Sequence, residues 1–265
     1  MKLIQEVVEI LDHLYVHGWD ERNGGNLSYI AEEEEVAEVC DIHSNLRSFT
    51  YPDVDLSVLI GKYFVITGTG KYFKNCKADP ETNLGILRVE DAHTLRLLWG
   101  YKNGGAPTSE APTHLLCHAT RLAIDPESRV VMHCHPTNVI AMSHICPVDS
   151  AKFTEILWKM QTESIVVFPE GVAVLPWMLC GGTDIGLATA AKIKDGYRSV
   201  VWGQHGLFGM GHDLDEAYGL IETIEKAAEI YMLIVGKDIK QSITNENLKE
   251  VAAAFHLTYR KGIID

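Results

Sequence analysis

The stretch VVMHCHP at residues 130–136 indicates where this chain places a central strand and a polar site. An apolar run that ends in alternating histidines is typical of a buried strand that stops at a pocket. Side chains on a strand alternate between its faces, so His133 and His135 are expected to point one way and Cys134 the other. Two imidazoles on one face at a strand end form a natural metal chelate. Pro136 is expected to open the helix that follows.

A third histidine, His205, follows an apolar run and precedes Gly206, so it too is expected at a strand end. Three neutral imidazoles, completed by a carboxylate or a water, suit zinc. A histidine near a strand end is also ordinary structure, which leaves a non-metal interpretation open. His114 and His118, four apart on one predicted helix, form a rival pair. They lack the glutamate of a zincin motif between them, so helix packing is favoured for that pair.

Three short polar segments, 23–26, 67–71 and 108–109, have the composition of an anion site. Glycines allow backbone amides to approach an oxyanion, and hydroxyls and side-chain amides add donors. The helix expected after Pro107 would add its dipole. The segment 67–71 lacks the full Walker spacing, so a nucleotide-binding loop is not predicted. Whether the three segments converge stays open from the sequence.

Helices and strands alternate along the chain, without a Pro/Ser-rich linker or an internal repeat. Residues 1–265 are therefore interpreted as one α/β domain around a central sheet. The irregular placement of helices disfavours a purely parallel, doubly wound sheet. The acidic run 32–35 is expected to be a solvated loop tip. Hydrophobic spacing predicts helices over 3–16, 111–123, 150–160, 183–194, 214–235 and 246–254, and strands over 27–30, 63–66, 84–89, 94–99, 129–133, 165–168, 172–175 and 199–202.

Composition narrows the classes of function. The 265 residues are 46% apolar and 22% charged, and the net charge of −13 argues against broad binding to nucleic acid or anionic membranes. Six cysteines without a Cys-x-x-Cys pair are expected to be buried free thiols in a reducing compartment. The sequence carries no signal-peptide pattern and no membrane span, so a cytoplasmic protein is expected.

Eight stretches match the motifs of one known family, in order along the chain. They are GWDERNGGNLS (18–28), FVITGTGKYF (64–73), LWG (98–100), PTSE (107–110), VMHCHPTN (131–138), FPEGVAVLPWM (168–178), HGLFG (205–209) and LDEAYGLIETIEKAAE (214–229). On these stretches the chain resembles the class II, metal-dependent aldolase/adducin-head family of sugar-phosphate enzymes. GWDERNGGN and LPWM indicate the rhamnulose-phosphate branch of that family.

The resemblance implies a central, mostly antiparallel β-sheet flanked by helices, one zinc ion per subunit, and a homotetramer with active sites at subunit interfaces. It implies reversible cleavage of L-rhamnulose 1-phosphate to dihydroxyacetone phosphate and L-lactaldehyde. The family's zinc ligands fall on His133, His135 and His205. Its catalytic glutamates fall on Glu110, near the metal, and on Glu163, contributed across an interface. Its phosphate-binding positions fall on Asn23, Gly25, Asn26, Thr69, Gly70, Thr108 and Ser109.

Some positions depart from the family pattern, and other functions stay open. Gln204 and Glu170 are not the residues expected beside the motifs, and no catalytic role is transferred to Glu170.

A Schiff-base aldolase is disfavoured, because the segments 103–151 and 160–191 contain no lysine. The alternatives are an aldolase for L-fuculose 1-phosphate, a 4-epimerase of the same fold, and a non-catalytic, adducin-like association module. A zinc hydrolase is disfavoured, because the chain has no His-Glu-x-x-His motif.

Overall fold

A nine-stranded sheet organises residues 2–265, which are the residues that the computed structural model describes. Every neighbouring pair of strands is antiparallel except β7 and β8, which run parallel. The expectation of a mostly antiparallel sheet is confirmed. The spatial order is β2 (Arg47–Thr50), β5 (Thr94–Gly100), β4 (Leu84–Val89), β3 (Tyr63–Thr67), β1 (Asn26–Ala31), β6 (Val130–Cys134), β9 (Gly206–Gly211), β8 (Ser199–Trp202) and β7 (Ala173–Leu175).

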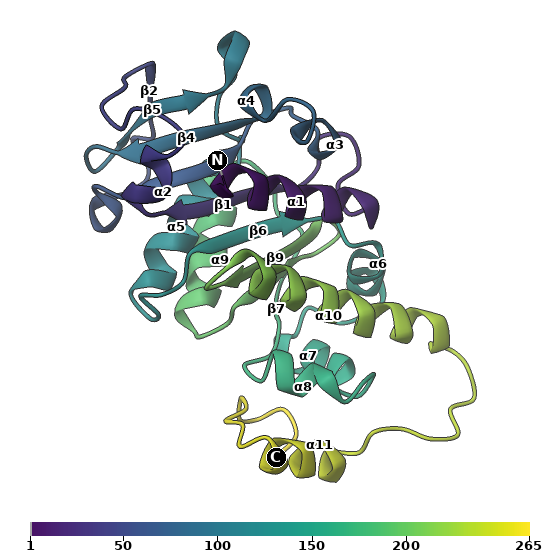
Figure 1. Cartoon of the computed structure of the whole chain (residues 1–265). Helices are drawn as coiled ribbons and strands as arrows, with labels where there is room; N and C mark the ends of the chain where they lie inside the picture. Colours follow the sequence, from purple (N-terminus) through teal and green to yellow (C-terminus); the bar gives the residue numbers. More distant parts are fainter. Residues whose placement is uncertain (1) are drawn as a thin grey trace.

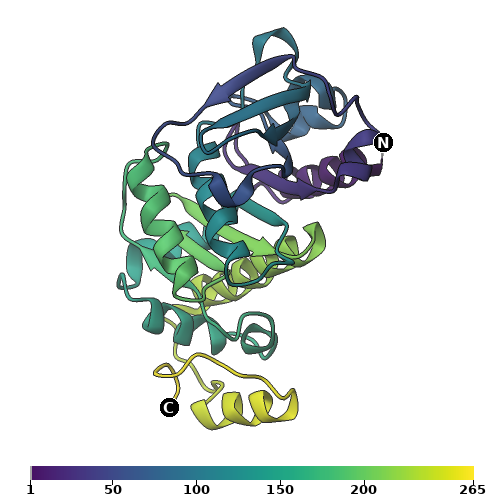
Figure 2. The same cartoon turned by 90° about the vertical axis from the view of Figure 1, so that its left-hand side faces the viewer.

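Helices cover both faces of this sheet (Figures 1 and 2). α1 (Lys2–Val16) and α10 (Leu214–Ile234) bury their apolar sides against one face. α5 (Ala111–Leu122) and α9 (Thr183–Lys194) cover the other face and pack against each other. The remaining helices are α2 (Glu33–Ala37), α3 (Phe73–Cys76), α4 (Pro80–Asn83), α6 (Thr137–Ile145), α7 (Ser150–Trp158), α8 (Glu163–Val167) and α11 (Asn245–Ala254), with 3-10 turns at Ser57–Leu59 and Lys102–Gly104.

Strand β6 lies in the middle of the sheet and alternates its side chains as the sequence predicts. Met132 and Cys134 belong to the core under α1 and α10. Val131 belongs to the core under α9, and His133 stacks on Phe208 of the neighbouring strand β9. Asn26 of β1 is the register partner of His133 on the other side. His133 is therefore fully buried between two strands, on the face that α5 covers.

Two predicted elements are wrong. Residues 32–35 do not form a loop tip, because they begin helix α2, where Glu32 and Glu35 form a capping box and Val36 is buried. Acidic side chains in a first turn are favoured by the helix dipole, which outweighs their mutual repulsion. Residues 165–168 are not a strand, because they lie within and just after helix α8. A short apolar run has no period that separates a strand from a buried helical turn.

The cysteines are free, but they are not all buried. Cys76, Cys117 and Cys134 are buried, whereas Cys40 and Cys146 are partly exposed and Cys180 is exposed. The expectation of buried thiols is therefore wrong for Cys180. Within residues 2–265, no helix combines the length and the apolar character that a membrane crossing needs.

Candidate metal centre and active site

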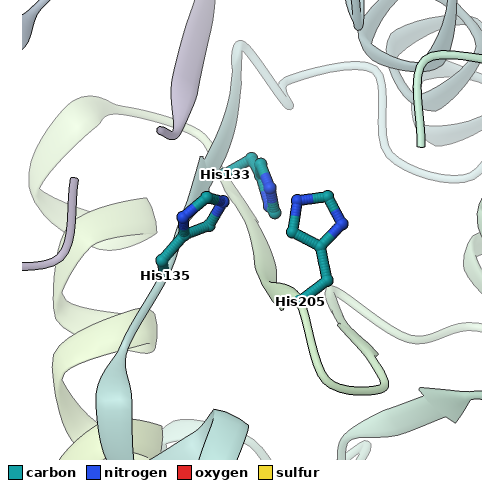
Figure 3. A group of neighbouring side chains, drawn as sticks. All are labelled: His133, His135 and His205. Atoms are coloured by element: carbon teal, nitrogen blue, oxygen red, sulfur yellow. The ribbon is translucent and has the colours of Figure 1, made fainter. Parts of the chain in front are cut away.

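Three histidines from two parts of the sheet meet in one place (Figure 3). His133 lies in β6, His135 follows β6 directly, and His205 lies in the turn between β8 and β9. One ring nitrogen of each histidine lies within 4.8 Å of those of the other two. The structure thus brings together the three residues that the sequence indicates as metal ligands.

Glycines allow this close approach. A Cβ atom on Gly206 would lie 2.4 Å from the Cys134 carbonyl oxygen and 2.8 Å from the His133 ring. A Cβ atom on Gly24 would lie 2.7 Å from His135 Nδ1. All three distances are shorter than real Cβ contacts, so both positions need glycine if the imidazoles are to keep this arrangement.

Gln204 attaches the turn that carries His205 to Ser143 of helix α6. Gln204 has a φ of 57°, a left-handed conformation that costs free energy in a residue with a side chain. Its backbone N–H donates to Ser143 Oγ at 2.8 Å, and its side-chain amide donates to the Ser143 carbonyl at 2.9 Å. These two bonds fasten the turn to α6. The unexpected residue at position 204 therefore has a structural role next to His205.

The hydrogen bonds of His133 fix its proton. Its Nδ1 lies 3.1 Å from the Leu207 carbonyl, which can only accept, so Nδ1 carries the hydrogen and Nε2 carries a lone pair. That Nε2 is buried and has no hydrogen-bond partner among the described residues. Burial and the neighbouring histidines hold the pKa of His133 well below its usual range. A neutral ring with an unsatisfied buried lone pair is what a metal cation would complete.

The other two imidazoles also fit the role of metal ligands. His135 Nδ1 lies 2.9 Å from Glu21 Oε1, an arrangement in which a carboxylate orients a ligand ring and leaves Nε2 for the metal. Burial, followed by the proximity of His135, lowers the pKa of His205 to about 4. His133 and His205 are therefore neutral near pH 7, as nitrogen ligands must be. The donor set fits a divalent metal.

Glu110 stands beside this centre. It immediately precedes α5, and its Oε2 lies 3.8 Å from His133 Nε2. The side chain is buried, which raises the pKa of its carboxyl, while a 2.9 Å hydrogen bond from Asn26 Nδ2 lowers it in part. A carboxylate with this placement can exchange a proton with a molecule held at the histidines.

A second group of metal-binding atoms overlaps the first. Cys180, in the exposed segment between β7 and α9, offers its Sγ within 4.8 Å of ligand atoms of Glu110 and His205. The centre is therefore bordered by a segment that also carries two exposed apolar side chains, Trp177 and Leu179.

The three candidate anion segments are neighbours in the structure. Thr69 N–H donates to the Ala106 carbonyl and Thr108 N–H donates to the Thr67 carbonyl, both at 2.9 Å, so the end of β3 pairs with the segment before α5. Leu27 N–H donates to Thr67 Oγ1 at 3.0 Å, which places the start of β1 against the same strand end.

The seven expected phosphate positions differ in their exposure. Four of them are exposed, Gly25 is intermediate, and two are buried. The exposed ones are Asn23, Thr69, Gly70 and Ser109, and the buried ones are Asn26 and Thr108. The Asn26 side chain is engaged with protein groups on both sides, Glu110 and His114. Its position links the loop 23–26 to the carboxylate at the metal centre.

Glu163 lies elsewhere in this chain. It is the exposed first residue of α8, a helix that packs against α7, α10 and α11 rather than at the strand ends that carry the histidines (Figure 1). The structure of one chain therefore does not bring Glu163 to Glu110.

Sequence reasoning missed several contributors to the site. Glu21 lies within the stretch GWDERNGGN but has no motif that assigns it to His135. Glu225 accepts from the N–H groups of Asn138 and Val139 and so supports the start of α6, two residues beyond His135. The sequence favours helix packing for His114 and His118, and both are buried on α5; their hydrogen bonds to Ser28 are an additional finding. Only their four-residue spacing signalled a shared partner.

Comparison with known proteins extends these findings over nearly the whole chain. The chain is 47% identical to rhamnulose-1-phosphate aldolase from Listeria innocua over 99% of its own length and 96% of that protein. It is 47% identical to rhamnulose-1-phosphate aldolase from Enterococcus faecalis over 99% of its length and 94% of that protein. A sugar-phosphate aldolase of Thermotoga maritima matches with a TM-score of 0.75 and 28% identity, covering 91% of this chain and 98% of that one.

The family model described as the class II aldolase and adducin N-terminal domain matches residues 5–232. That range includes the three histidines, Glu110, Glu163 and all of the expected phosphate positions. Class II aldolases are metal-dependent, in agreement with the candidate metal centre. The chain belongs to the class II aldolase and adducin N-terminal domain family.

Proposed function

We propose that this chain is an aldehyde-lyase that reversibly cleaves L-rhamnulose 1-phosphate to dihydroxyacetone phosphate and L-lactaldehyde. The observation that carries the proposal is the cluster of three histidines, with an unpartnered buried His133 Nε2 and the Glu110 carboxylate 3.8 Å from it. The full-length relatives named rhamnulose-1-phosphate aldolase support this choice of substrate. Residues 1–265 act as one catalytic domain in this proposal.

The metal in this proposal is zinc, one ion per subunit, held by His133, His135 and His205. Neutral imidazoles suit zinc, and they leave the positive charge of the ion undiminished. When bound, such an ion supplies Lewis-acid polarisation of substrate oxygens, worth several kcal/mol of barrier. The chain's contribution is to keep His133 and His205 neutral, to orient His133 and His135 through Leu207 and Glu21, and to bring the three rings close together beside two glycines.

In this proposal, Glu110 and Glu163 carry out the proton transfers. As the C3–C4 bond breaks, a base takes the proton of the C4 hydroxyl and L-lactaldehyde leaves. The remaining three-carbon enediolate then gains a proton at C3 and becomes dihydroxyacetone phosphate. Burial of Glu110 supports a role in proton exchange, because a carboxyl with a raised pKa exchanges protons nearer neutral pH. Kinetics of the single variants Glu110→Gln and Glu163→Gln assign the two steps to the two glutamates.

Glu163 takes part only if another subunit supplies it. Its exposed position on α8 supports this, because it is accessible to a neighbouring chain. We therefore propose a homotetramer in which each active site combines Glu110 of one subunit with Glu163 of the next.

The phosphate group is proposed to lie in the cluster of three segments beside the metal centre. Exposed donors at Asn23, Thr69, Gly70 and Ser109, together with Gly25 and Thr108, surround this region, and Asn26 links it to Glu110. Six free cysteines are typical of a reducing compartment, so we place the reaction in the cytoplasm.

The test is an aldol assay with dihydroxyacetone phosphate and L-lactaldehyde, followed by product analysis. We expect L-rhamnulose 1-phosphate, loss of activity on chelation, and recovery with zinc alone. Cleavage that survives complete demetallation would reject the zinc mechanism. Faster cleavage of L-fuculose 1-phosphate, or epimerisation at C4, would move the chain to a related activity. A purified chain that binds no zinc would support the association module instead.

A further inference from the structure

A line of buried polar side chains leads from Glu110 away from the metal centre and into the interface between the sheet and α5. Asn26 Nδ2 donates to Glu110 Oε2 at 2.9 Å, and Asn26 Oδ1 is in contact with His114 Nε2. His114 Nδ1 lies 2.7 Å from Ser28 Oγ, and Ser28 Oγ lies 2.8 Å from His118 Nε2. Asn26 and Ser28 are on the same face of β1, and the two histidines are one turn apart on α5.

Each imidazole in this line is neutral. His114 and His118 are completely buried, and this burial lowers the pKa of both to about 3. A neutral imidazole has one N–H donor and one lone-pair acceptor, and the two exchange places between tautomers. The direction of every hydrogen bond in the line therefore depends on which nitrogen of His114 carries the hydrogen.

An ionised Glu110 allows only one direction. A carboxylate can only accept, so Asn26 must present its NH₂ group to Glu110 and its Oδ1 to His114. His114 then carries its hydrogen on Nε2, accepts from Ser28 at Nδ1, and Ser28 accepts from His118 Nε2. In this direction the unpartnered His118 Nδ1 is a lone pair rather than a buried N–H. Unpartnered buried acceptors are tolerated better than unpartnered buried donors, so this direction is favoured.

We propose that His114 is a positioning residue for Glu110, acting through Asn26. By donating from Nε2, His114 prevents the Asn26 amide from turning over and facing its oxygen to the carboxylate. The Asn26 NH₂ group then holds Glu110 Oε2 beside the histidines. This inference rests on the proposed function, in which Glu110 exchanges protons with the substrate.

Three variants of the zinc-loaded enzyme separate this role from simple packing. His114→Leu removes both polar atoms at similar volume, and His114→Gln keeps an N–H near the place of Nε2. His118→Leu is the matched control, because it removes an equally buried imidazole one turn along α5 without touching Asn26. Zinc content and thermal midpoint are measured for all three, together with kcat and KM for the ketose phosphate.

We expect His114→Leu to lower kcat by about 10²-fold, the effect of misplacing a reacting group by about 1 Å, with little change in KM. His114→Gln should recover at least about tenfold of that loss, and His118→Leu should lower kcat far less at a similar thermal midpoint. Equal losses of kcat in His114→Leu and His118→Leu would overturn the inference, because they would indicate packing alone.

A measurement on the wild-type protein keeps the inference testable without catalysis. Nitrogen-15 NMR of the histidine rings distinguishes the two neutral tautomers. We expect His114 to be protonated at Nε2, and a ring protonated at Nδ1 would overturn the inference. An inactive wild-type enzyme with an Nε2-protonated His114 would instead contradict the proposed function and leave the hydrogen-bond direction intact. If His114→Leu does not fold, the kcat of His114→Gln and the tautomer of His114 in the wild-type protein test the inference.

Discussion

Asn26 connects three parts of the site through one side chain. It ends the glycine-rich loop 23–26, opposes His133 in the sheet register, and donates to Glu110. Both ends of its amide are used, so neither an acid nor an apolar residue reproduces its contacts. The resemblance makes Asn26 one of seven expected phosphate positions, and the Asn-Gly-Gly-Asn segment itself carries no sign of what its last side chain contacts.

Replacing Asn26 tests this connection. Asn26→Asp replaces the donor by a second carboxylate facing Glu110, so repulsion would displace the Glu110 side chain. We expect kcat to fall by about 10²-fold or more while zinc remains bound, because the three ligands are unchanged. Steady-state kinetics together with metal analysis check this. Turnover within about threefold of wild type would contradict the assigned contact.

Glu21 tests the support of the metal ligands. Because its carboxylate orients His135, Glu21→Gln should weaken zinc binding by about 10- to 100-fold, as loss of such a partner does in other metal sites. Competition with a chromogenic chelator measures the affinity. Glu9→Gln, an exposed change on α1, is the control and should leave it unaltered. Equal affinities in the two variants would remove Glu21 from the site.

At the scale of elements, long periodic segments were predictable and short ones were not. α1, α9 and α10 follow their predicted ranges within a residue or two, because each buries a continuous apolar stripe. α8 was predicted as a strand, because a single apolar turn carries no period, and α2 was hidden by its acidic composition. The strand β9 was not predicted, because its three glycines lower its strand character, although paired neighbours on both sides stabilise it.

The start of α6 gives a test at this scale. Glu225 of α10 accepts from the backbone N–H groups of Asn138 and Val139 and from the Asn138 side chain. Glu225→Gln removes the charge and one acceptor, and should lower the free energy of unfolding by about 1–3 kcal/mol. Glu222→Gln, exposed on the same helix, is the matched control and should stay within about 0.5 kcal/mol of wild type. Equal denaturation midpoints in the two variants would show that the bond adds nothing.

Helix α5 makes the fold sensitive to acid. The pKa of His118 is about 3 in the folded chain, below its ordinary value of 6.5, so the unfolded chain binds the proton first as pH falls. Stability is therefore lost below about pH 6.5, by about 2 kcal/mol for such a histidine between pH 7 and pH 5. Denaturant titrations at both pH values should show a smaller acid loss in His118→Leu than in wild type. The same loss in both would contradict a buried neutral His118.

At the scale of the whole molecule, the sequence indicates the three histidines of the candidate metal centre, whereas the proposed sharing of the site between subunits involves more than one chain. Three histidines at expected strand ends indicate a candidate metal site and leave a non-metal interpretation open. The structure brings the three rings together, because one sheet contains all of these strands. Glu163 is expected at the site only from the resemblance, because no motif in the sequence around Glu163 indicates a neighbouring subunit.

Mixing two inactive variants tests the shared site. Glu110→Gln and Glu163→Gln should each abolish turnover, because every site then lacks one glutamate. When the two are unfolded together and reassembled, roughly a quarter of the sites should regain both glutamates in a symmetric ring. Activity of the mixture, compared with each variant treated alone, measures this. No recovery in a mixture that refolds with zinc bound would refute a site shared between subunits.

The register of β1 against β6 has a consequence for the choice of substrate. Asn26 opposes His133, so the end of the loop 23–26 and the candidate metal centre lie on adjacent strands, whose backbones are about 4.8 Å apart in the hydrogen-bonding direction. This short spacing favours a substrate whose phosphate is close to the oxygens that a metal would bind. A ketose phosphorylated on carbon 1 meets this requirement, because its phosphate is next to its chelating oxygens. With the phosphate at this loop, as proposed, a sugar phosphorylated at its far end would have to fold back on itself to reach both groups.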